Sequence, residues 1–401
     1  MKKKFNSLII IRKSSSEIDW IIPVMEKMNK SVKFYTLFLN QNAYESLKKN
    51  NILFKRWQKI SKNYYVQNRI DRVFFKILKK ILGWFSKSLE KQLAFKIHDL
   101  EYLKRKLKIK NSENLHFILN EFQKISFWAN SVINKNSNTK LFLFPHTTHI
   151  YKYSKKDLSI IKKKGLKKEC DAVFLGNKLD IEVWKSLINK NNIYITGHPK
   201  YDSFWQRKFD TKYKKIKKKN IIFALKNITD EASYKSTLYY LKIISKIVKK
   251  NNYFLTIKLP PYPQKELIEI INSFSLLSEK KYFSVSNENI FKLLKNANIL
   301  INFNLSATSL DALSNGVPVI QLPAISKLKE RYGKNDSIYT KLKLAFKVSK
   351  AENLEKKINY IFRNKLKTKK YFTQNYYKYF PKNQNSSETV SKIILDKISL
   401  I

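Results

Sequence analysis

The feature that most constrains the fold of this chain is an alternation of short β-branched or aromatic runs with longer segments of helical period. Such an alternation is typical of parallel sheets whose strands are joined by crossover helices. In the first half, strands are expected at 8–11, 33–38, 141–144, 172–175 and 193–196. In the second half the pattern restarts, with strands expected at 221–225, 254–257, 283–286, 299–302 and 319–322. The sequence therefore predicts an α/β protein with two doubly wound parallel sheets.

The length supports two domains, because 401 residues exceed one ordinary domain and 43% of them are hydrophobic, which is enough for two cores. A polar, Lys-dense stretch at 206–219 has no clear apolar face, and we interpret it as the interdomain linker. The predicted N-terminal domain is therefore 1–205 and the predicted C-terminal domain is 220–380. A last helix is expected at 387–400, after a polar break.

The formal net charge of +51 would suggest a nucleic-acid partner, because Lys and Arg neutralise phosphates. The basic residues are mostly Lys, however, whereas Arg, which suits bidentate recognition best, is scarce. The Lys is accompanied throughout by Asn, Ile, Tyr and Phe, whose codons are also A/T-rich, so genome composition explains much of the excess. We expect no nucleic-acid partner, and we assign the remaining charge to phosphate-bearing substrates or an anionic membrane surface.

Cys170 is the only cysteine, which excludes an internal disulfide, and it lacks the spaced Cys and His partners of a zinc site. A reducing cytoplasm fits this usage. Lys interrupts every apolar stretch before it reaches the roughly eighteen residues that span a bilayer. We therefore expect a cytoplasmic protein, either soluble or peripheral on the inner face of the plasma membrane.

One long helical segment, about 69–110, falls outside the alternation. Its apolar arc runs through Ile70, Phe74, Ile81 and Phe85, and Lys side chains occupy the opposite arc. A helix that lies in an anionic interface has this arrangement. A core helix with a solvated basic face explains the pattern equally well, so both interpretations of this insertion stay open.

The most informative stretch is 298–320, where a strand ends and small hydroxyl residues lead into a helix. Free amides at a helix start can hold a diphosphate, with Ser306, Thr308 or Ser309 as added hydroxyl donors. Asp311, one turn further on, could accept hydrogen bonds from ribose hydroxyls. Without further information the same pattern also fits an ordinary βαβ turn.

This small-residue turn, followed by Asp311-Ala312 and then by Gly316-Val317-Pro318-Val319-Ile320, resembles the nucleotide-binding signature in the C-terminal domain of GT-B enzymes. Asp311 stands where the family has a Glu whose carboxylate holds the ribose, and it is one methylene shorter. Gly316 is expected to end the helix in a left-handed cap. The resemblance implies two Rossmann-like domains that face each other across a cleft, with the last helix returning toward the N-terminal domain.

A second match lies in the segment Thr196-Gly197-His198-Pro199-Lys200-Tyr201-Asp202. It resembles the Thr-Gly-Asn-x-x-x-Asp segment that closes the N-terminal domain in UDP-N-acetylglucosamine 2-epimerases and related surface-polysaccharide proteins. The resemblance implies that Gly197, His198 and Asp202 lie at the cleft or hinge.

Two shorter matches point to capsule and CDP-glycerol transferase-like proteins. Leu143-Phe144-Pro145-His146-Thr147-Thr148 is similar to their strand-Pro-His-Gly-Thr turn, with Thr147 in place of Gly. Thr256-Ile257-Lys258-Leu259-Pro260-Pro261 is similar to their Lys-x-His-Pro turn, with Pro260 in place of His. Since that His is expected to contact phosphate, its absence weakens a phosphotransferase assignment. Lys258 remains as a cation near the donor diphosphate.

The candidate general base is His146, because imidazole near neutral pH accepts a hydroxyl proton and the residue follows an expected strand end. Glu17 and Asp19 are alternatives in the loop after the first strand, although a helix cap explains either. His149 and His198 are rivals for the same role, whereas His98 and His116 are expected on helical segments and carry no functional prediction.

These observations favour a glycosyltransferase of bacterial surface (capsular) polysaccharide biosynthesis. The partners would be a nucleotide-sugar donor and a carbohydrate or lipid-linked acceptor, with no metal or cofactor required. The alternatives are a CDP-polyol phosphotransferase and a sugar-nucleotide 2-epimerase, for which the first half offers no evident set of carboxylates. A basic nucleic-acid-binding protein is the non-enzymatic alternative.

Overall fold

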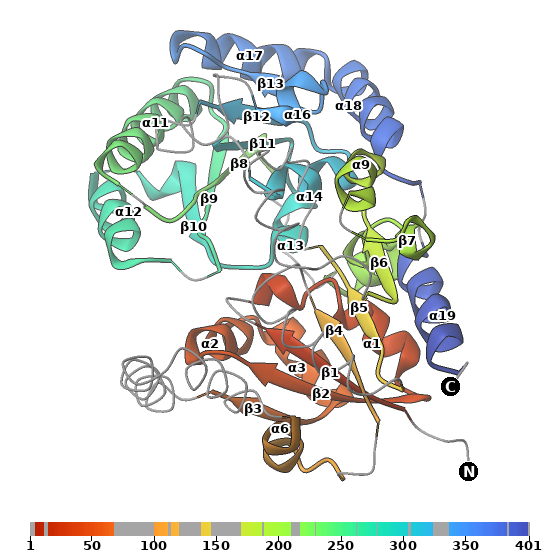
Figure 1. The fold of residues 1–401 in the computed structure, drawn as a ribbon. Coiled ribbons are helices and arrows are strands. Elements are labelled where there is room, and N and C mark those ends of the chain that lie inside the picture. Colours follow the sequence, from red (N-terminus) through yellow and green to blue (C-terminus); the bar gives the residue numbers. More distant parts are fainter. Residues whose placement is uncertain are drawn as a thin grey trace, which may run out of the picture. The chain divides into compact units, whose positions relative to one another are not determined.

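The computed structural model divides the chain into two compact units, of which unit 1 comprises Met1–Trp205 with Pro381–Ile401 and unit 2 comprises Gln206–Phe380 (Figure 1). The residues that the structure describes are 5–11, 15–67, 100–110, 114–119, 138–145, 170–186, 188–209, 217–228, 230–261, 263–277, 279–303, 306–323, 337–382 and 385–399. The apolar arc of the helical segment predicted at about 69–110 therefore lies outside the described residues, and so does half of the predicted linker, 210–216.

Unit 1 is built on a parallel sheet whose described strands follow the order β3-β2-β1-β4-β5-β6-β7. These strands are β1 (Phe5–Ile11), β2 (Val32–Phe38), β3 (Ser61–Val66), β4 (Leu115–Leu119), β5 (Leu141–Leu143), β6 (Ala172–Leu175) and β7 (Ile193–Ile195). The central strands β1 and β4 are mostly apolar, and both of their faces are buried. The edge strand β3 instead alternates half-buried with exposed residues at its start.

The described helices of unit 1 include two, α2 (Gln41–Lys49) and α3 (Asn51–Ile60), that begin at Asn caps. The other described helices are α1 (Ile22–Met28), α6 (Leu100–Leu107), α9 (Ile181–Lys185) and α19 (Ser386–Ser399), and the short α10 (Ser203–Gln206) spans the boundary to unit 2. Asn40 caps α2 by accepting from the Ala43 amide at 2.8 Å, and Asn50 caps α3 in the same way.

Unit 2 repeats the plan with a parallel sheet in the order β10-β9-β8-β11-β12-β13. Its described strands are β8 (Asn220–Ala224), β9 (Phe254–Lys258), β10 (Phe283–Ser286), β11 (Ile299–Phe303), β12 (Val319–Leu322) and β13 (Phe346–Lys347). Its described helices are α11 (Glu231–Lys250), α12 (Lys265–Leu277), α13 (Ile290–Leu294), α14 (Thr308–Ser314), α16 (Ile338–Lys341), α17 (Glu352–Arg363) and α18 (Lys365–Tyr379). Both sheets confirm the predicted doubly wound α/β fold.

Three strands were not predicted from the sequence. β3 has a polar start and lies at an edge, β13 is only two residues long, and β4 is a five-residue apolar run. Such a run fits a buried strand or a helix segment equally well. His116, which the sequence had placed on a helical segment, belongs to β4. Its ring is buried and accepts a hydrogen bond at Nδ1 from the Lys140 amide at 3.2 Å, and burial lowers its pKa to about 4.

Asp202 anchors the last helix to unit 1. Its fully buried carboxylate accepts hydrogen bonds from the amides of Ser386 and Ser387 at 2.7 and 2.8 Å and from the Ser387 hydroxyl at 2.5 Å. Gly197 adopts φ 78°, and a Cβ there would lie 2.7 Å from the Ser386 hydroxyl. Gly197 and Asp202 together therefore fix the position of the first residues of α19.

Removal of the Asp202 carboxylate should loosen α19. We expect Asp202→Ala to destabilise unit 1 by about 1–3 kcal/mol, because it leaves buried donors of Ser386 and Ser387 without their acceptor. Asp396→Ala is the matched control, since Asp396 is an exposed residue at the other end of the same helix. The midpoint of thermal unfolding and amide hydrogen exchange over 386–399 measure the effect. Equal behaviour of the two variants would contradict this account.

Candidate functional site

The strand order of unit 2 determines where a ligand site is expected. β8 is the first strand of the unit, the chain then adds β9 and β10 on one side, and β11 and β12 lie on the other side. The order reverses between β8 and β11, and open α/β sheets bind ligands at the carboxyl ends of strands beside such a switch point. The candidate site is therefore the carboxyl edge of β9, β8 and β11.

The parallel register aligns three residues at this edge. Ala224, the last residue of β8, pairs with Lys258 of β9 on one side and with Asn302 of β11 on the other. Since neighbouring strands lie about 4.8 Å apart, Lys258 and Asn302 are separated by about 10 Å. Lys258 was predicted for the site, and the structure places it at the edge beside the switch point.

Two lysines at this edge are held in surroundings that disfavour their charge. Lys258 is buried, its Nζ donates to the carbonyl oxygen of Leu259, and burial lowers its pKa to about 8 although Glu288 opposes the shift. Lys226, which follows the end of β8, also has its pKa lowered to about 8 by burial. Burial removes the water that stabilises the charged form of both ammonium groups. An anion bound here would stabilise that charged form instead.

Asn302 connects the end of β11 to the start of α14. Its Nδ2 donates to the hydroxyls of Thr308 and Ser309 at 3.0 and 2.9 Å. The hydroxyl of Thr308 is in turn 2.7 Å from that of Ser306. Ser306 and Thr308, both predicted for the site, are thereby brought together at the edge.

Ser309 has a different position from its two neighbours. It is fully buried, and its hydroxyl accepts from Gln321 of β12 at 3.0 Å as well as from Asn302. The hydroxyl of Ser337, which caps α16, donates to the side-chain carbonyl of Gln321. Ser309 therefore holds β11, α14 and β12 in place, and we infer that it supports the site by positioning Asn302.

Asp311 is buried within α14, and α18 packs against this helix. Burial raises the pKa of Tyr376 on α18, and Tyr377 and the Asp311 carboxylate raise it further. Gly316 closes α14 with φ 67°, which confirms the predicted left-handed cap. A Cβ at Gly316 would lie 2.7 Å from the Lys369 side chain, so glycine also permits the close approach of α18. Contact of Asp311 with a ribose stays a prediction.

Among the candidate bases of unit 1, the structure describes Glu17 and Asp19. His146 and His149 lie outside the described residues. Glu17 is buried in the 3-10 turn Ser15–Glu17, and Asp19 follows it before α1; both come after β1 at the carboxyl edge of the sheet. The assignment of Glu17 or Asp19 as the general base stays a prediction.

His198 fills a space that a glycine leaves open. Its buried ring lies edge-on to Trp20 and Tyr201, with centroid distances of 6.4 and 5.4 Å. A Cβ on Gly176, which follows β6, would lie 1.9 Å from the Nε2 atom of His198. The structure thus shows a packing contact for His198 at the carboxyl edge of β6 and β7.

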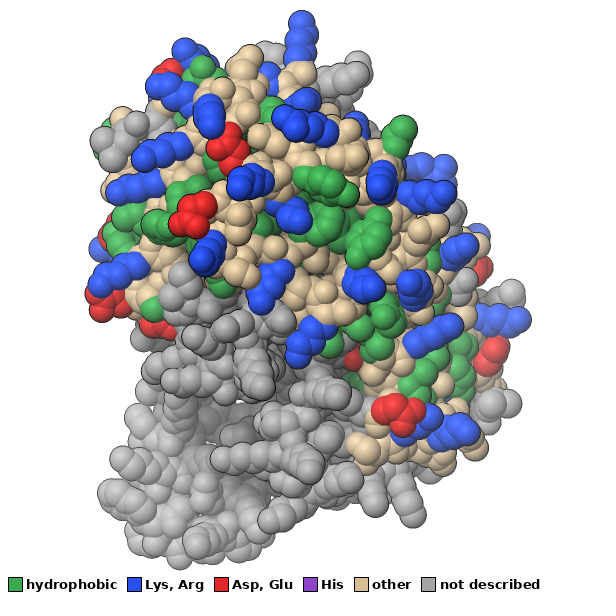
Figure 2. Space-filling model, turned by 90° about the horizontal axis from the view of Figure 1, so that it is seen from above, with side chains coloured by type: hydrophobic (Ala, Val, Ile, Leu, Met, Phe, Trp, Pro, Cys, Tyr) green, Lys and Arg blue, Asp and Glu red, His purple; other side chains and the backbone are tan. Residues whose placement is uncertain are grey.

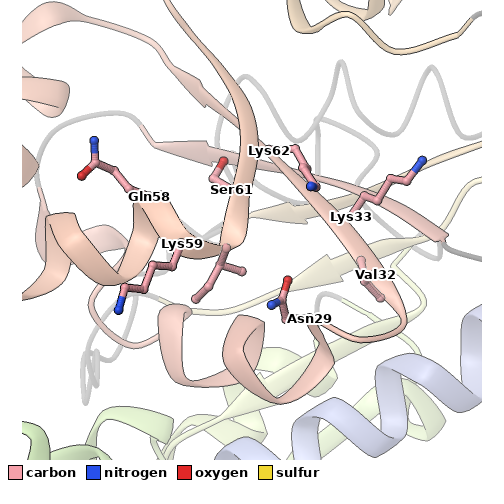
Figure 3. Close-up of a pocket in the computed structure, with 8 residues that line it drawn as sticks. Asn29, Val32, Lys33, Gln58, Lys59, Ser61 and Lys62 are labelled. Carbon is pink, nitrogen blue, oxygen red and sulfur yellow. The ribbon is translucent and has the colours of Figure 1, made fainter.

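A cavity of ≈ 410 Å³ lies at the opposite, amino-terminal edge of the unit 1 sheet (Figure 3). Its lining comes from the ends of α1 and α3 and the starts of β2 and β3, and consists of Asn29, Val32, Lys33, Gln58, Lys59, Ile60, Ser61 and Lys62. Since ligands of open α/β sheets bind at carboxyl ends, this cavity is not the candidate site. Among the described residues, no His, Cys, Asp and Glu side chains gather as a metal site would require.

No family model matches the sequence, and no curated protein matches it. Solved structures match over nearly the whole chain. S. aureus MnaA in complex with UDP aligns with a TM-score of 0.63 at 12% identity and covers 99% of this chain and 98% of that chain. The UDP-GlcNAc 2-epimerase from Neisseria meningitidis bound to UDP-GlcNAc aligns at 0.61 and 11%, covering 98% of this chain and 100% of that chain. The wall teichoic acid polymerase TagF soaked with CDPG aligns with a TM-score of 0.58 at 13% identity, covering 99% of this chain and 90% of that chain.

These likenesses define the class of fold. The chain has the two-domain, GT-B-type α/β fold of these enzymes, with a parallel sheet and flanking helices in each unit. The predicted resemblance to the 2-epimerases and to CDP-glycerol transferase-like proteins is thereby confirmed at the level of the fold.

The packing of His198 against Gly176 can be tested by a double-mutant cycle. Gly176→Ala should destabilise the protein by about 1–3 kcal/mol, because the added methyl group overlaps the imidazole. The same substitution in a His198→Ala background should cost far less, since the ring is gone. Chemical denaturation of the four proteins gives the coupling free energy. Strictly additive effects would show that the two residues are not in contact.

Proposed function

We propose that this protein is a glycosyltransferase of bacterial surface polysaccharide biosynthesis and that it binds the diphosphate of a nucleotide-activated sugar at the carboxyl edge of the unit 2 sheet. The observation that carries the proposal is that Lys226 and Lys258 lie at the carboxyl edge of the sheet beside the switch point, at which the hydroxyls of Ser306 and Thr308 also meet after β11. The matched solved structures support it, because they were determined with UDP, UDP-GlcNAc and CDPG.

The charge of this edge suits a departing nucleotide diphosphate. In glycosyl transfer, the acceptor hydroxyl oxygen bonds to the anomeric carbon of the donor while the bond from that carbon to the diphosphate oxygen breaks. Negative charge grows on the diphosphate, and Lys226 and Lys258 would stabilise it together with the two hydroxyls. The acceptor proton passes to a general base, for which we retain His146, with Glu17 and Asp19 as alternatives.

The two lysines make nucleotide binding depend on pH in a defined direction. A lysine whose pKa is about 8 is charged below that pH and neutral above it. A bound diphosphate favours the charged form, so the affinity for UDP or CDP should be greatest below pH 8 and should fall as the pH rises through 8. The nucleotide phosphates are already ionised there, since a phosphate monoester has its second pKa near 6. Calorimetry between roughly pH 7.5 and 9.5, the range around these pKa values, should also detect proton uptake on binding.

Lys258→Met should weaken the binding of UDP or CDP by roughly tenfold or more, because a charge-assisted contact to the diphosphate is lost. Lys246→Met is the matched control, since Lys246 is exposed on α11 of the same unit. Titration calorimetry at fixed pH compares the two variants with the unmodified protein. An unchanged affinity in Lys258→Met would place the diphosphate elsewhere.

Substitutions at the base and at the ribose position should separate chemistry from binding. His146→Ala should leave nucleotide affinity intact and slow the release of nucleotide in the presence of acceptor by roughly a hundredfold or more. Asp311→Ala should mainly weaken nucleotide binding. Full turnover in His146→Ala would assign the base first to Glu17 or Asp19.

A sugar-nucleotide 2-epimerase is the second candidate, because a UDP-N-acetylglucosamine 2-epimerase structure aligns with a TM-score of 0.63 over 100% of this chain. The two functions differ in what happens without an acceptor. A transferase leaves UDP-GlcNAc unchanged under these conditions, whereas an epimerase produces the 2-epimer, which proton NMR distinguishes. Formation of the epimer at a catalytic rate would replace the transferase proposal.

A further inference from the structure

One part of unit 2 has a charge distribution that the nucleotide site does not explain. Between Glu355 and Glu388 the sequence holds nine Lys and Arg residues and no Asp or Glu. This acid-free stretch covers most of α17 and all of α18. Elsewhere on the described surface, acidic side chains pair with lysines, as Glu231 does with Lys235 on α11.

Helix α18 has an inner and an outer face with different roles. Phe372 and Tyr376 are buried, and this inner face packs against α14 of the candidate site. The outer face carries Leu366, which is 83% exposed, and Tyr377, which is 41% exposed. These two residues are eleven positions apart, which is about three helical turns, so they lie along one line on the helix. Lys370 lies between them along that line.

Aromatic side chains extend this outer face toward α17. Tyr371 stacks on Phe346 of the edge strand β13 with an interplanar angle of 8°, and Tyr360 of α17 lies edge-on to the same ring. Both tyrosines keep about two fifths of their surface exposed, at 39% and 43%. Lys357 lies over the Phe346 ring at 4.5 Å. The aromatic side chains are thus fixed by packing while their edges remain at the surface.

We define the α17–α18 surface by six exposed side chains, which are Tyr360, Leu366, Lys367, Lys370, Tyr371 and Tyr377. Figure 2 views the described part of unit 2 from the side on which α17 lies in Figure 1, and it shows Lys and Arg side chains over much of that face, with hydrophobic side chains between them and few acids.

We propose that the α17–α18 surface docks on an anionic lipid bilayer. Tyrosines are enriched at the level of lipid headgroups, where their rings are partly buried and their hydroxyls stay wet. Lysines beside them reach anionic headgroups with flexible stems, and each contributes roughly a fivefold gain in partitioning. Leu366 enters the boundary of the acyl region. A nucleic acid fits less well, because a phosphate backbone offers no apolar surface for Leu366.

This docking mode differs from an interfacial helix within the segment at about 69–110 and does not depend on the proposed catalytic activity. Because α18 contacts α14 through its inner face, a bilayer on its outer face would bring the nucleotide site of unit 2 close to the membrane. A lipid-linked acceptor in that membrane would then be close to the protein, whichever unit binds it.

The experiment is sedimentation of the full chain with phosphatidylcholine vesicles that either contain or lack phosphatidylserine. Lys367→Glu with Lys370→Glu should lower binding to the anionic vesicles by roughly tenfold or more. Lys242→Glu with Lys246→Glu makes the same change in charge on exposed positions of α11 and should lower it much less. Leu366→Asn keeps the charge and should lower binding by about fivefold through lost apolar burial.

Thermal midpoints and UDP affinity of all three variants should match those of the unmodified protein, which separates docking from folding and from the nucleotide site. The proposal is overturned if the unmodified chain does not sediment with anionic vesicles, or if the α11 variant loses as much binding as the α18 variant. It is also overturned if Leu366→Asn binds vesicles fully and the α18 lysines instead govern binding to duplex DNA.

Discussion

The candidate site of unit 2 depends on the parallel register at Ala224. Because β8 pairs in parallel with β9 and β11, the carboxyl ends of all three strands meet at one edge, with Lys258 and Asn302 on either side of Ala224. A shift of the register by one residue would turn each side chain to the other face of the sheet. The alignment of a buried cation, a polar amide and two hydroxyls is therefore a direct consequence of the backbone pairing.

Buried polar side chains maintain this edge and the chain connections around it. In unit 2, Asn302, Ser309 and Gln321 satisfy one another between two strands and α14, so the start of that helix is held in one position. In unit 1, Asp202 and Gly197 do the same for the start of α19. In both units, polar residues that look like ligand groups in the sequence are used partly or wholly to position the backbone.

The sequence predicted the fold well because nearly every strand of unit 2 is a distinct apolar run between helical segments. It missed β3, whose polar start at a sheet edge gives no such signal, and it placed His116 on a helix because a short apolar run is ambiguous. Lys258 and the hydroxyls at 306–309 were predicted for the site through motifs. Lys226 was not predicted, because a single Lys does not stand out among 81 basic residues. The role of Asp202 depends on a partner 184 positions away, which no local pattern reveals.

The central claim is that the carboxyl edge of β9, β8 and β11 holds a nucleotide diphosphate. The most direct test is a crystal structure of the full chain soaked with UDP or CDP. The account predicts diphosphate density at that edge, with phosphate oxygens in hydrogen-bond contact with Lys226 or Lys258 and with the hydroxyl of Ser306 or Thr308. A nucleotide bound instead at the amino-terminal edge of the unit 1 sheet, in the cavity of Figure 3, would contradict it.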